Sequence, residues 1–353
     1  MIRKTFMDVY NKILKYSNKD ITKVNINNYI KGREVSINNR IDYSCAFLKN
    51  EIPIRLAKRI KELDNLPIEL SSKPSVNKVR NWYIESFYDF YDDQKNNVSN
   101  EELLNTCEIV YKRHENTLVK MAQGIKEADI SKLDKEKLKY FLDNFYINRI
   151  DLRFLLGQYI EYFDEKENHI GLINMETNIV ENVKNSLISV ENITNINNLD
   201  FPKVNINYES NIKIPYIPSY LNYVLTEILK NSVKSLNDRY TDEKITYSDN
   251  LLNVNLYDDE HLLVIKISDK GQGIKEHDMN KIWNYTFSTT NINTDDLHGK
   301  EDFGYNSLIS GLGYGLPISK LYLKYFNNYI NIFSKYNYGT DVYITIRKNT
   351  KFN

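Results

Sequence analysis

Cysteine is almost absent from this 353-residue chain, which contains only Cys45 and Cys107. Two thiols are too few for a disulfide scaffold or for a zinc site with four thiolates. We therefore expect both to be core residues. Long apolar runs are also lacking, since none approaches the roughly 20 residues that span a bilayer.

An excess of charge of one sign is absent too, because 47 Lys and Arg residues balance 47 Asp and Glu residues. A balanced charge produces no long-range field that would attract nucleic acid or an anionic membrane, so we expect neither as a partner. The chain is 41% hydrophobic and 12% aromatic, which excludes full disorder. Its length is typical of roughly two domains.

The N-terminal 19 residues carry five basic side chains against one acid, Asp8, and their apolar residues fall at helical spacing. Two interpretations are open. Organelle transit peptides are basic and amphipathic, so the segment could be a targeting helix. Alternatively, it is the first helix of a folded domain with a solvated basic face.

The first half of the chain is predicted to be helical, because apolar residues recur three or four positions apart. Ser99 and Ser131 are candidate N-caps for the third and fourth helices. Four long helices with short breaks predict an antiparallel bundle. The predicted helices are Cys45–Leu63, Val76–Tyr91, Leu103–Ala128 and a long one from Ser131 through Tyr159.

The pattern changes after Asp164–Asn168 to alternating strands mixed with helices, which predicts an α+β unit with helices on one face of a sheet. The predicted helices are Thr177–Asn192, Tyr220–Leu236 and Leu321–Phe326. The predicted strands are Lys203–Tyr208, Leu252–Leu256, Leu262–Ile267, Tyr329–Phe333 and Asp341–Ile346.

Glu227 and Asn231 lie four residues apart on a predicted helix, so they project from one face. An amide oxygen is a hard ligand suited to Mg²⁺, and a nearby carboxylate can act as a general base. A solvated polar stripe on an amphipathic helix would give the same pattern.

Two glycine-containing motifs follow. In Asp269-Lys270-Gly271-Gln272-Gly273, a carboxylate at a strand end can accept the amino hydrogen of adenine, although a plain turn is the alternative. Gly311-Leu312-Gly313-Tyr314-Gly315-Leu316 precedes an apolar helix, where backbone N–H groups and the helix dipole favour phosphate. Later, Gly339-Thr340 lies between two strands, and the Thr340 hydroxyl could bind the adenine edge or a water.

In this order, these motifs resemble the ATP-binding domain of the GHKL superfamily, over residues 215–347. The polar stretch Asn291–Ser310 is typical of a mobile lid over the phosphates or of a disordered insertion, and the two are not exclusive. The first half is similar to the mitochondrial α-ketoacid dehydrogenase kinases, both the pyruvate and the branched-chain branches. The similar segments are Glu51–Ile60, Lys73–Val76, Trp82–Phe87, Arg113–Asn116, Met121–Gly124 and Leu142–Tyr146.

This resemblance implies a four-helix bundle for regulation and docking over residues 1–168, then a GHKL-type α/β sandwich over residues 169–353. It implies a homodimeric serine kinase of the mitochondrial matrix that phosphorylates and inactivates E1α and binds the lipoyl domain of E2. Glu227 would be the general base and His114 would tune it. Asn231 would hold Mg²⁺, with K⁺ as a further candidate ion. ATP would contact Lys234, Asp269, Gly271, Gly273, Ser288, Thr289, Gly311, Gly313, Gly315, Leu316 and Thr340.

Some positions depart from the family pattern. Ser232 and Lys234 stand near positions where Ala and Arg are common, and a lysine cannot form the bidentate fork of an arginine. The C-terminal Asp-Trp associated with lipoyl binding is absent. The resemblance also implies a keto-acid pocket lined by Tyr83, Ser86, Arg149 and Arg153. A kinase-inactive nucleotide-binding module and a GHKL-type histidine or small-substrate kinase remain alternatives.

Overall fold

The chain divides into two compact units, Met1–Leu172 and Ile173–Asn353. They are described from a computed structural model, which covers residues 2–24, 26–91, 98–129, 133–243, 251–287 and 313–348. The sequence predicted that the first domain ends at residue 168, which is four residues before the end of the first unit. The short strand β1 (His169–Ile170) lies between these two positions.

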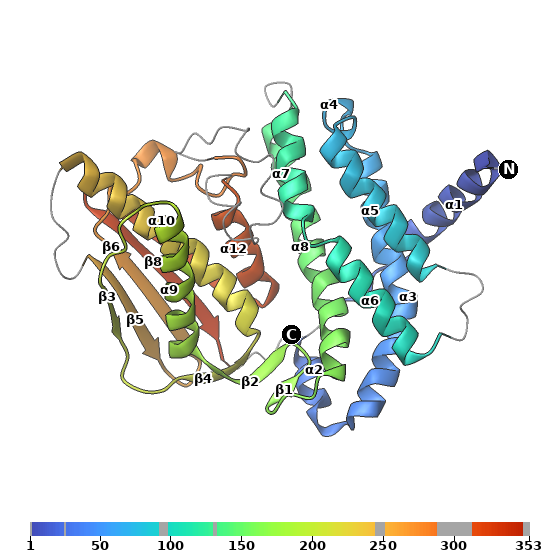
Figure 1. Cartoon of the computed structure of the whole chain (residues 1–353), viewed down its shortest axis with the longest axis horizontal. Coiled ribbons are helices and arrows are strands. Elements are labelled where there is room, and N and C mark those ends of the chain that lie inside the picture. Colours follow the sequence, from blue (N-terminus) through green and yellow to red (C-terminus); the bar gives the residue numbers. More distant parts are fainter. Residues whose placement is uncertain are drawn as a thin grey trace. The chain divides into compact units, whose positions relative to one another are not determined.

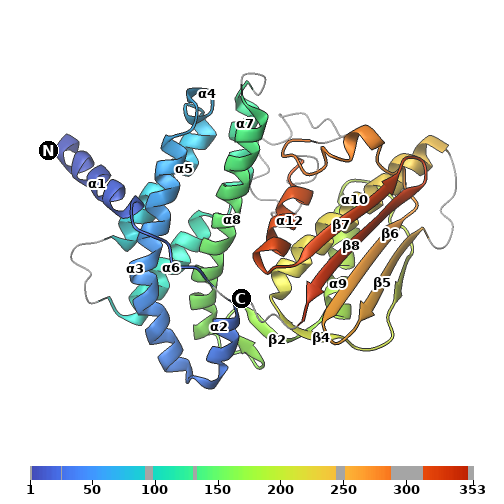
Figure 2. The same ribbon diagram turned by 180° about the vertical axis from the view of Figure 1, so that it is seen from behind.

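The first unit is built from helices (Figures 1 and 2). Among the described residues, α3 packs against α1, α5 and α8, while α7 packs on α5 and α6 on α8. The elements are α1 (Ile2–Ser17), α2 (Ile26–Lys31), the 3-10 turn η1 (Gly32–Glu34), α3 (Ile37–Asp64), α4 (Ile68–Ser71), α5 (Pro74–Phe90), α6 (Asn100–Arg113), α7 (Thr117–Glu127), α8 (Lys135–Ile160) and η3 (Glu161–Phe163). None of these described helices is long and apolar enough to cross a membrane.

Helix ends in this unit follow capping chemistry. Ser99 caps α6 as predicted, and Glu102 completes a reciprocal capping box with it. The other predicted cap, Ser131, lies outside the described residues. The described part of the fourth helix begins at Lys135, where the Asp134 carboxylate accepts two backbone N–H groups.

The predicted continuous helix Leu103–Ala128 is wrong, because the chain breaks into α6 and α7 at residues 114–116. The Arg149 guanidinium donates to the carbonyl oxygens of His114 at 3.3 Å and Glu115 at 3.0 Å. In an unbroken helix those carbonyls would accept N–H groups of the next turn. Arg149 of α8 therefore binds carbonyl groups at the break, and the His114 carbonyl also accepts the Thr117 N–H at 3.3 Å.

The C-terminal half of α1 belongs to the packed core of this unit. Ile13 is buried, and the Tyr16 ring packs edge-on against Phe87 and Tyr91. This packing favours the interpretation of the segment as the first helix of a folded domain. Elsewhere in the unit, Cys45 and Cys107 are buried and free, as predicted.

The second unit contains a five-stranded sheet in the order β3-β5-β6-β8-β7, antiparallel except for the parallel pair β3–β5. Its helices cover one face, in front of the sheet in Figure 1 and behind it in Figure 2, so the predicted sandwich is confirmed. The strands are β3 (Val204–Asn207), β5 (Leu252–Asp258), β6 (Leu262–Asp269), β7 (Tyr329–Lys335) and β8 (Gly339–Arg347). The helices are α9 (Ile179–Ile196), α10 (Pro218–Glu243), the 3-10 turn η4 (Glu276–Asp278) and α12 (Gly315–Tyr325).

A short antiparallel pair, β2 (Ile173–Asn178) and β4 (Lys213–Tyr216), was not predicted. The helix expected from Thr177 begins two residues later, at Ile179. Its N-cap is Asn178, whose side chain accepts the N–H of Glu181.

Strand alternation explains how this sheet presents polar groups to a site. Leu263, Ile265 and Ile267 of β6 are fully buried under the helices, and Asp269 is the next inward position. The strand period therefore places a carboxylate at the end of an apolar column. The opposite face is solvent-exposed and carries Phe333, which is 64% exposed.

Candidate functional site

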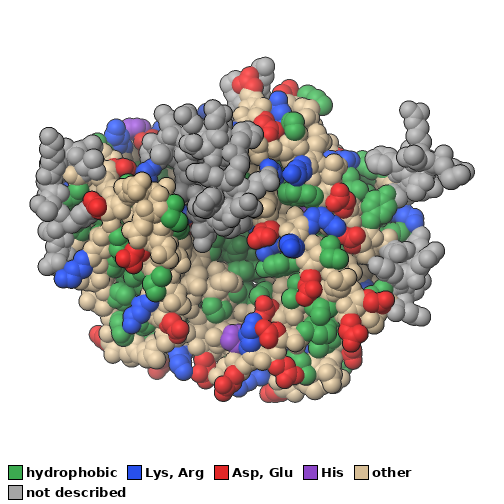
Figure 3. Space-filling model, viewed as in Figure 1, with side chains coloured by type: hydrophobic (Ala, Val, Ile, Leu, Met, Phe, Trp, Pro, Cys, Tyr) green, Lys and Arg blue, Asp and Glu red, His purple; other side chains and the backbone are tan. Residues whose placement is uncertain are grey.

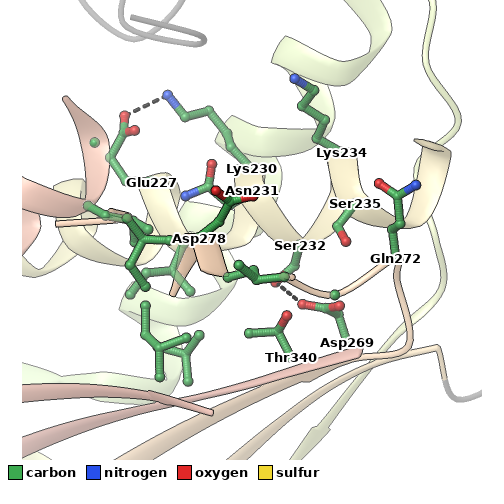
Figure 4. Close-up of a pocket in the computed structure, with 18 of the residues that line it drawn as sticks. Glu227, Lys230, Asn231, Ser232, Lys234, Ser235, Asp269, Gln272, Asp278 and Thr340 are labelled. Carbon is green, nitrogen blue, oxygen red and sulfur yellow. Dashed lines mark hydrogen bonds and ion pairs between the residues drawn. The ribbon is translucent and has the colours of Figure 1, made fainter. Parts of the chain in front are cut away.

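A cavity of about 380 Å³ lies in the second unit, between α10, the chain after β6, the start of α12 and strands β7 and β8 (Figure 4). Its size is within the range of small-molecule sites. Predicted site residues that line it are Glu227, Asn231, Lys234, Asp269, Gly273, Gly313, Gly315, Leu316 and Thr340. Ser288, Thr289, Gly311 and the expected lid lie outside the described residues.

Helix α10 supplies the polar wall of the cavity. Glu227, Asn231 and Lys234 are spaced by four and then three residues, so they share one face of the helix. Ile228 and Leu229 beside this face are buried in the core, and Ile228 also lines the cavity. The helix therefore serves the core and the site at once.

The Glu227 side chain is 4% exposed and accepts a hydrogen bond from Lys230 Nζ at 2.5 Å. It also rests against the N-terminus of α12, because a Cβ added at Gly315 would lie 2.2 Å from Glu227 Oε2. A lysine and the positive end of a helix dipole thus face one carboxylate. Together they fix its position at the edge of the cavity.

Asp269 lies at the opposite side of the cavity floor (Figure 4). Its Oδ1 accepts the Gly271 N–H at 3.0 Å, and its Oδ2 accepts the Ser232 hydroxyl at 3.0 Å. Burial raises the pKa of Asp269 to about 6, although these hydrogen bonds and one from the Thr340 backbone lower it. At neutral pH the Asp269 carboxylate is therefore an ionised hydrogen-bond acceptor in a part of the cavity that is shielded from solvent. Such an acceptor suits an amino group of a ligand.

The two glycines after Asp269 let their loop pack tightly between helix α10 and the β7–β8 turn. A Cβ at Gly271 would lie 2.3 Å from Ser235 Oγ. Gly273 has φ of +68°, and its Cβ would lie 2.1 Å from the Lys335 carbonyl oxygen. Packing, in addition to any approach of a flat base, accounts for glycine at both positions.

Phosphate and metal chemistry would fall at the other end. The Tyr314 side chain makes no capping hydrogen bond at the start of α12, where a helix dipole favours anions. Burial lowers the pKa of Lys234, while Asp238 opposes this shift. Within the described ranges no group of three His, Cys, Asp or Glu side chains could hold a metal. The Asn231 amide oxygen suits Mg²⁺ bound mainly by phosphates and water.

Sequence reasoning missed several residues of the cavity. Lys230 is three positions after Glu227, a spacing that would have indicated the ion pair. Tyr336 also lines the cavity, and Lys275 Nζ lies 5.2 Å from its ring centroid. This contact depends on the β7–β8 turn and left no signal in the local sequence.

His114, the remaining predicted residue, belongs to the helical unit. Its Nε2 lies 3.0 Å from Ser86 Oγ, and its ring packs 4.4 Å from the centroid of Tyr83. Burial, with smaller contributions from the charges of Arg149 and Arg113, lowers the pKa of His114 to about 3. The imidazole is therefore neutral at physiological pH.

Comparison with known proteins matches both halves of the chain. The family described as mitochondrial branched-chain alpha-ketoacid dehydrogenase kinase matches residues 17–174. The family described as histidine kinase-, DNA gyrase B-, and HSP90-like ATPase matches residues 217–350. Among curated relatives, the mitochondrial [pyruvate dehydrogenase (acetyl-transferring)] kinase of Arabidopsis thaliana is 32% identical over 86% of this chain and 84% of its own length. Isozyme 4 of Mus musculus is 33% identical over 86% and 76%.

Proposed function

The chain belongs to the mitochondrial α-ketoacid dehydrogenase kinase family, and from this premise we propose that it is an ATP-dependent serine kinase acting on E1α of such a complex. Phosphorylation would inactivate that complex. The observation that carries the proposal is the meeting of Glu227, Asn231 and Asp269 with the start of α12 around one cavity.

Each side of the cavity has a part in binding ATP. The Asp269 carboxylate accepts the adenine amino group, and the Thr340 hydroxyl faces the same edge of the base. The α12 N-terminus and the glycine-rich chain before it receive the phosphates. Mg²⁺ held through Asn231 would neutralise phosphate charge.

Glu227 accepts the proton of the substrate serine as the serine oxygen bonds to the γ-phosphorus. The bond from that phosphorus to the bridging oxygen of ADP breaks, and ADP leaves with its electron pair. Lys230 holds Glu227 in place through the 2.5 Å contact. Catalysis then depends on positioning and charge neutralisation, the main contributions in phosphoryl transfer.

We propose that the partner is the complex itself, with E1α as substrate, the E2 lipoyl domain as anchor and the mitochondrial matrix as location. A homodimer would use the open sheet face, where Tyr257, Tyr329 and Phe333 are exposed. On the face shown in Figure 3, acidic and basic side chains are interspersed.

The helical unit would carry regulation. The Tyr83 hydroxyl is buried without a hydrogen-bond partner among the described residues. Burial raises the pKa of Tyr83 to about 12, and Arg149 and Arg59 oppose this effect. A keto-acid anion fits such a buried, arginine-rich environment. The tuning of Glu227 by His114 remains a prediction.

The test is phosphate transfer from radiolabelled ATP to purified E1 of the pyruvate and branched-chain complexes. Glu227→Gln should lower transfer at least about 100-fold, a typical contribution of a general base, while the Kd for ATP changes little. Glu191→Gln, at an exposed glutamate of α9, is the matched control and should behave as wild type.

Other outcomes would change the assignment. Transfer by Glu227→Gln at the wild-type rate would remove the general base from the mechanism. ATP binding by the wild-type protein without any transfer would favour a kinase-inactive module. Acid-labile phosphate on the protein would favour a histidine kinase.

A further inference from the structure

The first residue of the β7–β8 turn, Tyr336, places an aromatic ring at the edge of the nucleotide cavity. Tyr336 lines the cavity and is 41% exposed, so part of its surface is open to solvent. Lys275, from the loop after β6, also lines the cavity, and its Nζ lies 5.2 Å from the centroid of the ring. An ammonium near an aromatic face restrains the ring by cation–π attraction. The proposed phosphate transfer uses neither side chain.

Strand alternation explains why this ring points toward the cavity. Along β7, Ile330 is buried and Ile332 lines the cavity. Ser334 is the next residue on that side, and Tyr336 continues the series just after the strand ends. Side chains two residues apart in a strand share one face of the sheet. Tyr336 therefore ends a column of side chains that face the cavity, as Asp269 does on β6.

The backbone on each side of Tyr336 is held against the loop after β6. The Asn337 N–H donates to the Gln272 carbonyl oxygen at 2.7 Å. The Lys335 carbonyl oxygen would lie only 2.1 Å from a Cβ added at Gly273, so the two backbones are in close contact there. These contacts fix the start of the turn, and with it the position from which the ring extends.

The separation of Asp269 and Tyr336 suits a planar base. Asp269 on β6 is opposite Thr340 on β8, and Thr340 is opposite Ser334 on β7. Two strand spacings separate the backbones of Asp269 and Ser334 by roughly 10 Å, and Tyr336 lies two residues further along. A purine with its amino group at Asp269 extends away from the cavity floor, and this separation leaves room for it between the two side chains.

An aromatic ring recognises a different feature of a ligand from a carboxylate. The Asp269 carboxylate binds hydrogen atoms on the edge of a base, whereas a ring packs on the flat π face of the base and covers apolar surface. The phosphates are anions and belong at the start of α12. The flat, uncharged base is therefore the part of ATP that suits the ring of Tyr336.

We propose that Tyr336 binds the nucleotide by packing its ring on the purine at the mouth of the cavity, with Lys275 holding the ring in place. This inference rests on the proposed binding of ATP. Because the contact is with the base and not with the phosphates, it strengthens the binding of ATP and ADP by the same factor.

Tyr338 provides a matched control in the same turn. Asn337, with φ of +59°, turns the chain between the two tyrosines. Tyr338 is 74% exposed and is not among the described residues that line the cavity. Its ring is therefore as large as that of Tyr336 but has no place in the proposed contact.

The experiment measures the Kd of ATP and of ADP by calorimetry. Tyr336→Ala should raise both values about tenfold, a typical contribution of a ring that stacks on a base. Tyr336→Phe keeps the ring and lacks the hydroxyl, so both values should stay close to those of wild type. Tyr338→Ala should leave both values unchanged.

Two further measurements separate contact with the base from support of the turn. Ribose 5-triphosphate keeps the sugar and phosphates of ATP but has no base, so its Kd, measured by competition, should be the same in wild type and Tyr336→Ala. In NMR spectra, the adenine H2 and H8 signals should move upfield on binding to wild type, as protons over an aromatic ring do. They should move less on binding to Tyr336→Ala.

Three outcomes would overturn the inference while ATP binding stands. The first is an unchanged Kd for ATP in Tyr336→Ala. The second is an equal weakening of ATP and ribose 5-triphosphate, because the tyrosine would then support the loop without contacting the base. The third is a loss in Tyr336→Phe as large as in Tyr336→Ala, because the hydroxyl would then be the binding group. Failure of the wild type to bind ATP refutes the proposed function itself.

Discussion

We expect the Asp269 carboxylate to lower the stability of the folded chain and to strengthen ATP binding. Asp269→Asn should therefore raise stability and weaken ATP binding. Burial raises the pKa of this carboxyl from 3.8 to about 6. The folded state therefore holds its proton more tightly than the unfolded state between those two values. Stability falls as the pH rises through this window, and above pH 6 the folded chain bears the full cost of the buried charge.

The magnitude follows from the size of this shift. The difference between 3.8 and about 6 corresponds to roughly 3 kcal/mol at 1.36 kcal/mol per pH unit. An amide cannot accept every N–H that the carboxylate accepts, which returns about 1 kcal/mol. We expect Asp269→Asn to be more stable than wild type by about 1–2 kcal/mol at pH 8 and to lose this advantage near pH 5.

The same substitution should weaken ATP binding about 100-fold at pH 8, because an amide N–H₂ would then face the adenine amine. Wild-type affinity should itself fall about tenfold from pH 7 to pH 5 as Asp269 gains its proton. Thermal unfolding and calorimetric ATP titration at both pH values provide the measurements.

A matched control tests the sign of the argument. Backbone hydrogen bonds from His261 and Leu262 lower the pKa of the exposed Asp259, so Asp259→Asn should lose stability at pH 8, where Asp269→Asn gains it. If Asp269→Asn is less stable than wild type by the same amount at pH 5 and pH 8, burial does not govern the charge of this residue.

The close approach of Gly315 to Glu227 and the burial of His114 give two further predictions. Gly315→Ala would place a methyl group on Glu227 Oε2 and should lower kcat about 10- to 100-fold, measured by phosphate transfer. Gly32→Ala, with nothing within 4 Å, should leave the rate unchanged. The pKa of His114 is lowered from 6.5 to about 3 in the folded chain. Below pH 6.5 the imidazole is therefore protonated in the unfolded chain but not in the folded chain, and stability falls as the pH falls. His114→Gln should remove up to about 2 kcal/mol of the stability lost between pH 6.5 and pH 5, measured by urea unfolding; an equal loss in both proteins would contradict the buried neutral state.

Much of the second unit could be predicted because its signals are local. Helical spacing placed Glu227 and Asn231 on one face, and the Asp-x-Gly-x-Gly motif directly after an apolar strand indicated Asp269. The glycine-rich chain before α12 has its own signature, and the structure brings its described part to the same cavity. These features need only the period of one element.

The rest depends on partners far away in the sequence. Arg149, which binds two carbonyl groups at the break between α6 and α7, lies about 35 residues later, so this contact cannot be predicted from the pattern of residues 103–128. The strands β2 and β4 are short and gain their definition from pairing with each other.

In the proposed ATP site, the pairing of Asp269 with Thr340 across β6 and β8 links nucleotide affinity to strand register. A slip of β8 by one residue would leave a sheet of similar strand content but turn Thr340 to the solvent side. Such a misassembled chain would lack the proposed base-binding residues on one side of the sheet, so we expect nucleotide to stabilise only the correctly paired form, by RT ln(1 + [ATP]/Kd). In a cell with abundant ATP, the substrate would thus favour the native pairing of the last two strands.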